Sequence, residues 1–275
     1  MTLGELSMKK RAEVWAVSTR KGGVLKTSLT VNLAGALATK HNARVLIVDM
    51  DAQGNCLLSF GQNPDDVPFS IYDILMNTIS DPMECAINVH ENIDIIPAND
   101  DMSDFEFEVI PDKERFPEPF LLLKQGIEML RDEYDYILID TPPNFGLIQG
   151  NALMFADRVL VPFQPEPYSM RALVKIVKTI EKFKSEHNPN LDLMGVVATL
   201  VDMRTSLHCE IMEDTRHFCR AEGIPILDNI IPKSIRFAAS ITYEGLPATI
   251  VNPTHKAVEH YFDLLNEVKN YVSSK

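Results

Sequence analysis

Short apolar runs alternate with longer segments of helical periodicity along most of this chain. Residues 14–18 form the first apolar run, and from Thr27 onward apolar side chains recur at the spacing of one helix face. Residues 44–49 form the next run, a continuous apolar stretch typical of a strand buried on both faces. This order of strand, loop, helix and strand predicts a βαβ unit near the N-terminus.

The same alternation continues to the C-terminus. It predicts further strands at residues 93–97, 136–140, 158–162, 193–200 and 226–228, and helices over residues 120–131, 170–186, 209–222 and 254–272. Strands that alternate with helices favour an α/β fold, a doubly wound, mostly parallel sheet with helices on both faces. Residues 99–119, rich in Asp, Glu and Pro, are expected to form a surface loop that contains a short piece of helix. With no linker or repeat in view, we expect a single domain over residues 14–275 after a polar N-terminal extension, residues 1–13.

Composition narrows the class of protein. The 275 residues contain 45% hydrophobic and 24% charged side chains, with a formal net charge of -13, so the chain is not basic overall. A local basic patch remains compatible with that charge. No apolar run is long enough to span a bilayer, and residues 1–13 lack the apolar core of an export signal, so we expect a cytoplasmic protein without membrane contact. The cysteines form no CxxC pair and are expected to be reduced thiols: Cys56, Cys85, Cys209 and Cys219.

A glycine-containing loop between the first strand and the first helix points to phosphate binding. Such a loop turns backbone N–H groups towards an anion, a lysine adds charge at the outer phosphates, and a threonine offers its hydroxyl to magnesium. The ordinary pattern GxxxxGK[ST] fails at Arg20 and Leu25, which leaves KGGxxK[ST] with an additional lysine. A Gly-Gly turn beside two solvated lysines is the plainer alternative, and the strand–loop–helix context disfavours it. The segment predicted to bind ATP consists of Lys21, Gly22, Gly23, Val24, Leu25, Lys26, Thr27 and Ser28.

Three carboxylates follow predicted parallel strands. Asp49, Asp51 and Asp140 fall at the carboxyl ends of these strands, the edge of a doubly wound sheet where ligands bind. Magnesium prefers oxygen ligands and keeps several of its waters. We therefore expect Mg²⁺ to contact Thr27 directly and Asp49 and Asp140 through water. Any one of these carboxylates alone is also compatible with capping of a turn or helix.

Taken together, these motifs resemble the ParA/MinD branch of P-loop ATPases, from about residue 15 to residue 272. Residues 45–55 are similar to that family's Asp-x-Asp-x-Gln-Gly-Asn segment, and residues 134–143 to its Walker B strand. The resemblance implies a P-loop ATPase fold and catalysis by Lys21, Lys26 and Asp51. In that family the first lysine, here Lys21, reaches across a homodimer to the partner's ATP, and the residue at Asp51 orients the attacking water.

Leu25 departs from the family, which usually has glycine at this position. Leucine disfavours positive φ, so the peptide is either an ordinary conformer here or nucleotide affinity is altered. We expect nucleotide binding to persist because Lys26, Thr27 and the Gly22–Gly23 pair remain.

Two basic segments stand out in the C-terminal third, residues 202–206 and 231–237. The resemblance implies that their cations, Arg204, Lys233 and Arg236, bind DNA without sequence preference in the ATP state. It also implies that Pro232 and Ser234 contact the adenine, although relatives often have asparagine where Ser234 stands. Ordinary surface charge is the alternative. The lysines of residues 170–186 either extend the basic patch or, with Glu181 and Glu186, form a mixed solvated face.

The resemblance implies a slow, partner-stimulated ATPase that partitions plasmid or chromosome DNA. Its implied partners are a second copy of the chain, nucleoid DNA and a ParB-like adaptor. A relative that positions another cargo is an alternative that the sequence does not separate. A MinD-like membrane-surface regulator is a further alternative, but it requires a terminal basic amphipathic helix. Residues 258–268 are acidic and apolar instead, which favours a helix packed on the sheet.

Overall fold

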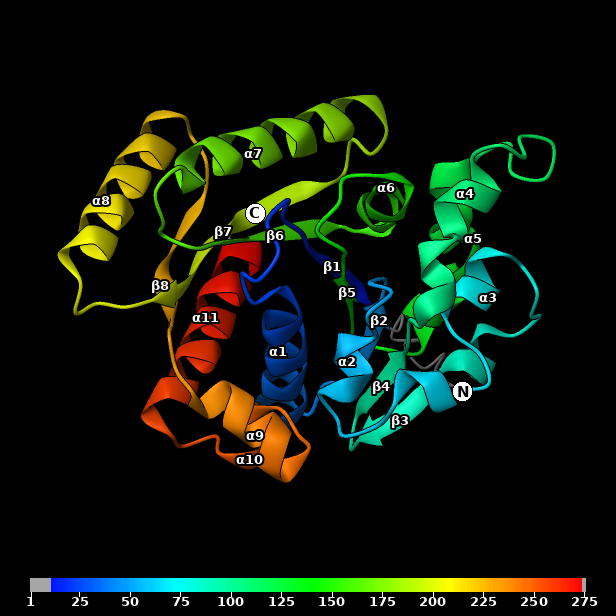
Figure 1. The fold of residues 1–275 in the computed structure, drawn as a ribbon, viewed down its shortest axis with the longest axis horizontal. Helices are drawn as coiled ribbons and strands as arrows, with labels where there is room; N and C mark the ends of the chain where they lie inside the picture. The colour runs from blue at the N-terminus through cyan, green and yellow to red at the C-terminus, as the bar shows by residue number, and fades with distance from the viewer. Residues whose placement is uncertain (1–10, 274–275) are drawn as a thin grey trace, which may run out of the picture.

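An eight-stranded sheet with helices on both faces organises residues 11–273, the part of the chain that this computed structural model describes (Figure 1). The strand order is β3-β4-β2-β5-β1-β6-β7-β8, and every neighbouring pair is parallel except β3 with β4. The strands are β1 (Glu13–Val17), β2 (Val45–Asp49), β3 (Ile87–His90), β4 (Ile93–Ile96), β5 (Tyr136–Asp140), β6 (Arg158–Phe163), β7 (Asp192–Val201) and β8 (Ile226–Pro232).

Two groups of helices cover the two faces of this sheet. The helices are α1 (Lys26–His41), α2 (Asn55–Leu58), α3 (Ile71–Leu75), α4 (Phe105–Val109), α5 (Leu122–Ile127), α6 (Leu147–Phe155), α7 (Ser169–Glu186), α8 (Ser206–Ala221), α9 (Arg236–Glu244), α10 (Ala248–Val251) and α11 (Lys256–Ser273). One face packs against α1, α2 and α9 to α11, and the other against α3 to α8 (Figure 1). The doubly wound α/β architecture predicted from the sequence is confirmed.

Successive side chains of the central strands point to opposite faces of the sheet and so pack into two separate cores. In β1, Val14 and Ala16 pack in the core under α3 to α8, whereas Trp15 and Val17 pack in the core under α1 and α11. Both sets are almost fully buried, which explains why the central strands appear as unbroken apolar runs. β1 lies between β5 and β6 at the centre of the sheet, and the order in which strands are added to the sheet reverses there. In doubly wound sheets the crevice at the carboxyl ends of such strands is where ligands bind.

Several elements differ from the sequence predictions. The helix predicted over residues 120–131 is α-helical only in α5, which is flanked by 3-10 turns at Pro119–Leu121 and Glu128–Asp132. The backbone leaves helical geometry at Ile127, beside Gly126, a residue that weakens helices and here packs tightly on Ile74. The strand predicted at residues 226–228 extends to Pro232. Neither β3 nor the helices α2, α3, α6, α9 and α10 were predicted.

The first and last regular elements of the described residues are β1 and α11. Residues 1–10 of the predicted N-terminal extension lie outside the described residues, and β1 begins at Glu13, within the extension's predicted bounds. At the other end, α11 buries Tyr261, Leu264 and Leu265 against the sheet. Within residues 11–273, no helix combines the length and the apolar character needed to cross a bilayer.

Candidate nucleotide and magnesium site

The loop between β1 and α1 has open space in front of its two glycines. A Cβ atom added to Gly22 or Gly23 would meet no other atom within 4 Å. A phosphate group needs this close approach to backbone N–H groups at the start of a helix. The cleft beside the loop has a volume of about 470 Å³ and is lined by Gly22, Gly23, Leu25, Lys26, Thr27, Ser28, Asp51, Gln53, Asn55 and Pro143. The predicted phosphate loop and the segment after β2 therefore face one cleft.

Leu25 adopts the left-handed conformation that a glycine would adopt easily. Its φ is 64° and its ψ is 30°, and its carbonyl accepts the first hydrogen bond of α1, from the Leu29 N–H at 2.8 Å. The alternative of an ordinary conformer at this position is therefore wrong. A left-handed leucine costs about 1–2 kcal/mol, and the Leu25 side chain packs against the core under α1. The loop thus keeps the backbone shape of the motif despite the departure in sequence.

Lys26 is buried at the floor of this cleft, with 8% of its surface exposed. Burial lowers the pKa of its ammonium group, while the charges of Asp140 and Asp51 oppose that shift. The two carboxylates therefore help to keep a cation in a place that water barely reaches. An ammonium held in this way suits contact with the outer phosphates of a nucleotide.

Asp140 collects hydrogen bonds from two threonines of α1. The Thr27 Oγ1 donates to Asp140 Oδ2 at 2.5 Å, and the Thr30 Oγ1 donates to Asp140 Oδ1 at 3.3 Å. Burial is the largest cause that raises the pKa of the Asp140 carboxyl, and the Thr27 bond and the Lys26 charge oppose the rise. The carboxylate at the end of β5 is thus tied to the hydroxyl predicted to contact magnesium.

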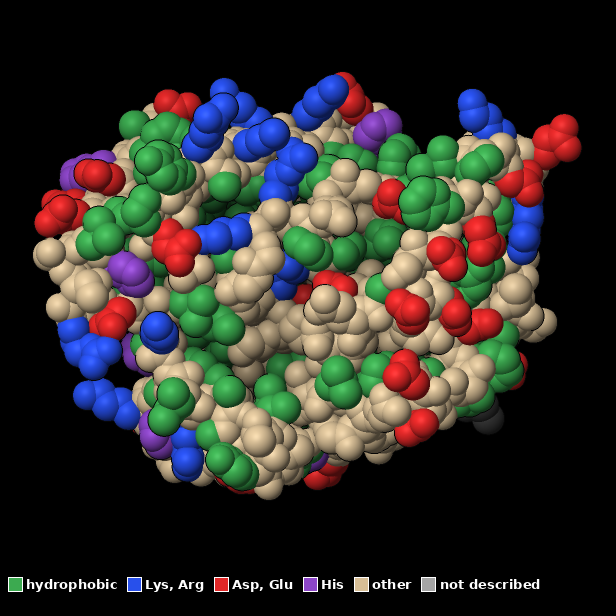
Figure 2. Space-filling view, viewed as in Figure 1, with side chains coloured by type: hydrophobic (Ala, Val, Ile, Leu, Met, Phe, Trp, Pro, Cys, Tyr) green, Lys and Arg blue, Asp and Glu red, His purple; other side chains and the backbone are tan. Residues whose placement is uncertain are grey.

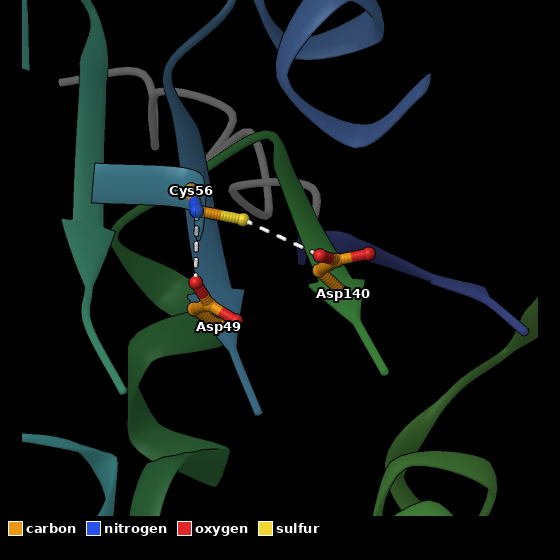
Figure 3. A group of neighbouring side chains, drawn as sticks. All are labelled: Asp49, Cys56 and Asp140. Carbon is orange, nitrogen blue, oxygen red and sulfur yellow. Dashed lines mark hydrogen bonds between the residues drawn. The ribbon is translucent and has the colours of Figure 1, made fainter. Parts of the chain in front are cut away.

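Asp49 lies directly beside Asp140, because the two residues are paired across β2 and β5. Asp49 accepts hydrogen bonds from the backbone N–H groups of Asp51, at 3.0 Å, and Cys56, at 2.9 Å. Burial raises the pKa of the Asp49 carboxyl, and the neighbouring Asp140 raises it further. Figure 3 shows the Cys56 side chain, from α2, directed towards Asp140, with its Sγ 3.7 Å from Asp140 Oδ2.

These buried groups fit a hydrated magnesium ion at the mouth of the cleft. Magnesium favours hydroxyl, carboxylate and water oxygens, and Thr27 is half-buried next to the two fully buried carboxylates. Carboxylates that lie behind a direct ligand orient it and the metal-bound waters. The direct contact of Thr27 and the water-mediated contacts of Asp49 and Asp140 remain predictions, and the geometry is compatible with each.

Asp51 lies on the cleft side of the same strand end. It is half-buried, lines the cleft, and accepts a hydrogen bond from the Gln53 N–H at 3.2 Å. One oxygen of Asp51 thus contacts the segment after β2, and the side chain lines the same cleft as the two glycines of the phosphate loop. Its role in orienting water remains a prediction.

Lys21, the additional lysine of the motif, is held within its own chain. Its ammonium group forms an ion pair with Glu166 and lies 3.5 Å from the Gln164 Oε1. Both acceptors come from the segment between β6 and α7, and Lys21 and Gln164 line a small pocket separate from the cleft. About a third of the Lys21 side chain is exposed. Reaching a partner's nucleotide therefore requires Lys21 to leave Glu166.

The three predicted DNA-contacting cations lie at the same edge of the sheet as the phosphate loop: Arg204 and Lys233 on the loops after β7 and β8, and Arg236 at the start of α9. Arg204 is exposed, but its guanidinium forks onto Asp202, with Nε–Oδ1 and Nη2–Oδ2 distances of 2.8 and 2.7 Å. These bonds hold the pKa of the Asp202 carboxyl far below its usual range. Arg236 donates to Asn252 at 3.2 Å, and its buried Nε has no hydrogen-bond partner among the described residues. Lys233 is exposed.

The predicted adenine contacts stand apart from this cleft. Pro232 ends β8, and the Ser234 hydroxyl accepts a hydrogen bond from the Arg236 N–H at 3.2 Å. Neither residue lines the cleft beside the phosphate loop. Their contact with a base remains a prediction.

Sequence reasoning missed four residues of this site. Thr30 carried a usable signal, because it follows Thr27 by three residues and so lies on the same helix face. Cys56 lies seven residues after Asp49, and its approach to Asp140 depends on the short helix α2. Gln164 and Glu166 carried no signal in the sequence, because they lie more than 140 positions from Lys21.

Comparisons with known proteins agree with this geometry. A family model described as AAA domain matches residues 12–193. A ParA family protein of Mycoplasma pneumoniae is 34% identical over 92% of this chain and 96% of its own length. The chromosome partitioning protein ParA of Caulobacter vibrioides is 33% identical over 93% of both chains.

A solved structure shares both fold and nucleotide. The cobyrinic acid a,c-diamide synthase from Mycobacterium smegmatis with bound ATP analog and magnesium has a TM-score of 0.82 and 28% identity, with 96% of both chains covered. ATP and magnesium are thus the cofactors of this chain. Given this fold, this site and relatives more than 30% identical over nearly the whole chain, the protein belongs to the ParA family and is a ParA-like P-loop ATPase.

Proposed function

We propose that this chain is a DNA-segregation ATPase in which ATP pairs two copies of the protein and the pair binds DNA without sequence preference. The observation that carries the proposal is the position of Lys21, which directly precedes the cleft-lining Gly22 but does not itself line the cleft and is paired with Glu166 instead. Lys26, Thr27 and the backbone of the loop already serve a nucleotide in the same chain. Lys21 is therefore available to contact the nucleotide bound to a second copy of the protein.

The roles of the residues follow from their positions. Lys26 neutralises the outer phosphates, Thr27 and the paired carboxylates hold hydrated magnesium, and Asp51 orients the attacking water. Magnesium supplies charge neutralisation for phosphoryl transfer, a reaction that depends mainly on positioning and electrostatics. Lys21 from the partner adds the last positive charge, so hydrolysis depends on dimerisation and is slow without a stimulating partner. We propose a ParB-like adaptor as that partner and the nucleoid as the place of action.

Arg204, Lys233 and Arg236 are the proposed DNA contacts near the cleft. Arg204 and Lys233 are exposed at the edge where the nucleotide binds, so a dimer would present two copies of the set. The Arg204–Asp202 fork shows that part of this charge is neutralised in the isolated chain. Release of Arg204 from Asp202 would therefore accompany DNA binding.

Among the alternatives, membrane binding by the C-terminal helix has little support. The apolar side chains of α11 are buried against the sheet, including Val258, Tyr261 and Val268. A helix that lies in a membrane interface must instead expose its apolar face. Positioning of another cargo would use the same switch with a different adaptor.

Co-sedimentation with random-sequence duplex DNA tests the proposal. Binding is expected with a non-hydrolysable ATP analogue, is expected to be weak with ADP, and is expected to fall steeply with salt. The Lys26→Ala variant, which loses the nucleotide contact, serves as the control and should not respond to the analogue. Equal binding with ATP analogue and ADP would contradict the switch.

A further inference from the structure

The exposed face of α7 carries a stripe of cations that the proposed site does not use. Arg171, Lys175, Lys178 and Lys182 are all exposed and are spaced by four, three and four residues. Residues at this spacing lie above one another on one side of a helix. Figure 2 shows Lys and Arg side chains gathered over α7, along the upper edge of this view. We call these four residues the α7 stripe.

Local charge sets α7 apart from the rest of the chain. The helix carries five cations against two glutamates, a net charge of +3, whereas the whole chain carries -13. Among the described residues, Lys182 is the one member of the stripe with an ion pair to a carboxylate, to Glu186 at 3.8 Å. Arg204, by contrast, forms an ion pair with Asp202. The stripe is therefore a larger unneutralised positive surface than the loops near the cleft.

The shape of the stripe fits a phosphate backbone. From Arg171 to Lys182 the helix rises roughly 16 Å, with one cation per turn. One strand of duplex DNA carries one charge per about 3.4 Å of the axis, so a stripe of this length is matched by roughly five phosphates of one strand. The other face of α7 is buried in the core through Leu173, Ile176 and Val177. Within α7 the exposed face thus offers charge without large apolar side chains, which suits a polyphosphate more than a lipid bilayer. The exposed aromatic next to the stripe is Tyr168, the residue before the helix.

We propose that the α7 stripe is a second contact surface for the backbone of duplex DNA, separate from Arg204, Lys233 and Arg236. This inference rests on the proposed DNA binding and adds a surface to it. The loop after β7 enters α8 at one end, whereas α7 lies beside the opposite end of α8 (Figure 1). The groove lined by Val177, Lys178, Phe218 and Glu222 shows the same proximity of α7 to the end of α8.

The beginning of α7 also lies beside the nucleotide site. Ser169, Ala172 and Leu173 from its first turn line a small pocket together with Thr19 and Lys21. Glu166, the partner of Lys21, lies three residues before the helix. When Lys21 leaves Glu166, the segment that leads into α7 loses a contact. In this proposal both the α7 stripe and the set Arg204, Lys233 and Arg236 therefore respond to the nucleotide.

A matched pair of variants tests the stripe. Lys175→Gln/Lys178→Gln removes two of its charges, and Lys113→Gln/Lys124→Gln removes two exposed charges elsewhere. Affinity for random-sequence duplex DNA is measured with an ATP analogue across a salt series, and thermal unfolding verifies that both variants are folded. The first variant is expected to bind more weakly and to reduce the slope of log K against log salt by about 1.8 for each protomer in contact, about 0.9 per phosphate lost. The second variant is expected to match the wild type.

The outcomes separate the two proposals. If the wild type binds DNA and Lys175→Gln/Lys178→Gln binds with the same affinity and slope, the α7 stripe is not a contact and the proposed function stands. If the wild type fails to bind DNA with any nucleotide, the proposed function fails and the stripe fails with it. Vesicles of phosphatidylcholine and phosphatidylserine form the third arm. Binding to these vesicles that depends on Lys175 and Lys178, without an effect on DNA, would overturn the assignment to nucleic acid.

Discussion

Lys21 forms an ion pair with Glu166, although the two residues are 145 positions apart in the sequence. The pair holds within one chain the lysine that, in our proposal, must reach the nucleotide of a partner. An exposed pair of this kind stabilises a conformation by roughly 0.5–1 kcal/mol. Because a dimer breaks two such pairs, their combined effect on dimerisation is about 1–2 kcal/mol.

The Glu166→Gln variant is therefore expected to dimerise more readily with ATP. Loss of the carboxylate frees Lys21, and the dimer dissociation constant is expected to fall roughly 5- to 30-fold. Light scattering with an ATP analogue over a range of protein concentrations measures this change. The Lys21→Ala variant is the control and should stay monomeric. Weaker dimerisation of Glu166→Gln would mean that Glu166 helps Lys21 to act and does not compete for it.

Substitutions of Leu25 are expected to rank by their tolerance of the left-handed conformation. Glycine and asparagine adopt this region readily, whereas a β-branched side chain is strongly disfavoured there. Leu25→Gly and Leu25→Asn should keep nucleotide affinity, and Leu25→Ile should weaken it by about 1 kcal/mol, or roughly fivefold in Kd. Calorimetric titration with ATP and magnesium measures the series. Equal affinity of the isoleucine and glycine variants would show that the backbone at residue 25 is not constrained.

The paired carboxylates predict how stability depends on pH in the absence of nucleotide. The folded chain raises the pKa of the Asp49 and Asp140 carboxyls through burial. Above the ordinary carboxyl pKa the folded state then binds more protons than the unfolded state, so stability falls as pH rises. The slope contributed by one such group reaches at most about 1.4 kcal/mol per pH unit.

Urea unfolding between about pH 5 and pH 8, with EDTA, measures this dependence. Asp49→Asn removes one of the titrating groups and keeps its size, so it should flatten the dependence of stability on pH. Asp94→Asn, at a carboxylate outside the site, is the control. A wild-type profile that rises with pH over this range would contradict the prediction.

Asp51→Ala is expected to separate ATP binding from hydrolysis. Asp51 lines the cleft without a bond to Thr27 or Asp140 among the described contacts, so its loss leaves the magnesium-binding groups in place. The variant should bind ATP with near-normal affinity, hydrolyse it at least tenfold more slowly, and accumulate a dimer that stays on DNA. Single-turnover hydrolysis and DNA retention measure both effects. Hydrolysis by Asp51→Ala at the wild-type rate would rule out a water-orienting role.

Much of the fold could be predicted because its central strands are buried on both faces. An unbroken apolar run such as that of β2 or β5 has few interpretations besides a parallel strand. The prediction weakened where polar residues enter the core. The helix α6 buries Gln149 and Asn151, and β8 contains Asn229 within its length, so neither element looked continuous. The edge strand β3 is half-exposed and too short to show a pattern.

The carboxylates of the site could be predicted from the sequence, but the partners of Lys21 could not. Asp49 and Asp140 end neighbouring strands, so topology alone brings them together. The partners of Lys21 come from the segment after β6, and no local pattern reports a contact between segments so far apart. The resemblance implied a DNA contact for Arg204, but its fork on Asp202, only two positions away, depends on the turn after β7.

Two backbone donors of the edge strand β8 are occupied by one side chain. Glu267 of α11 accepts hydrogen bonds from the N–H groups of Asp228, at 2.6 Å, and Asn229, at 3.0 Å. Those N–H groups are then unable to recruit an incoming strand, which is how an open sheet edge joins another chain. Addition of a strand at this part of β8 is therefore disfavoured. A single glutamate from the C-terminal helix thus protects the middle of one sheet edge from pairing with another chain.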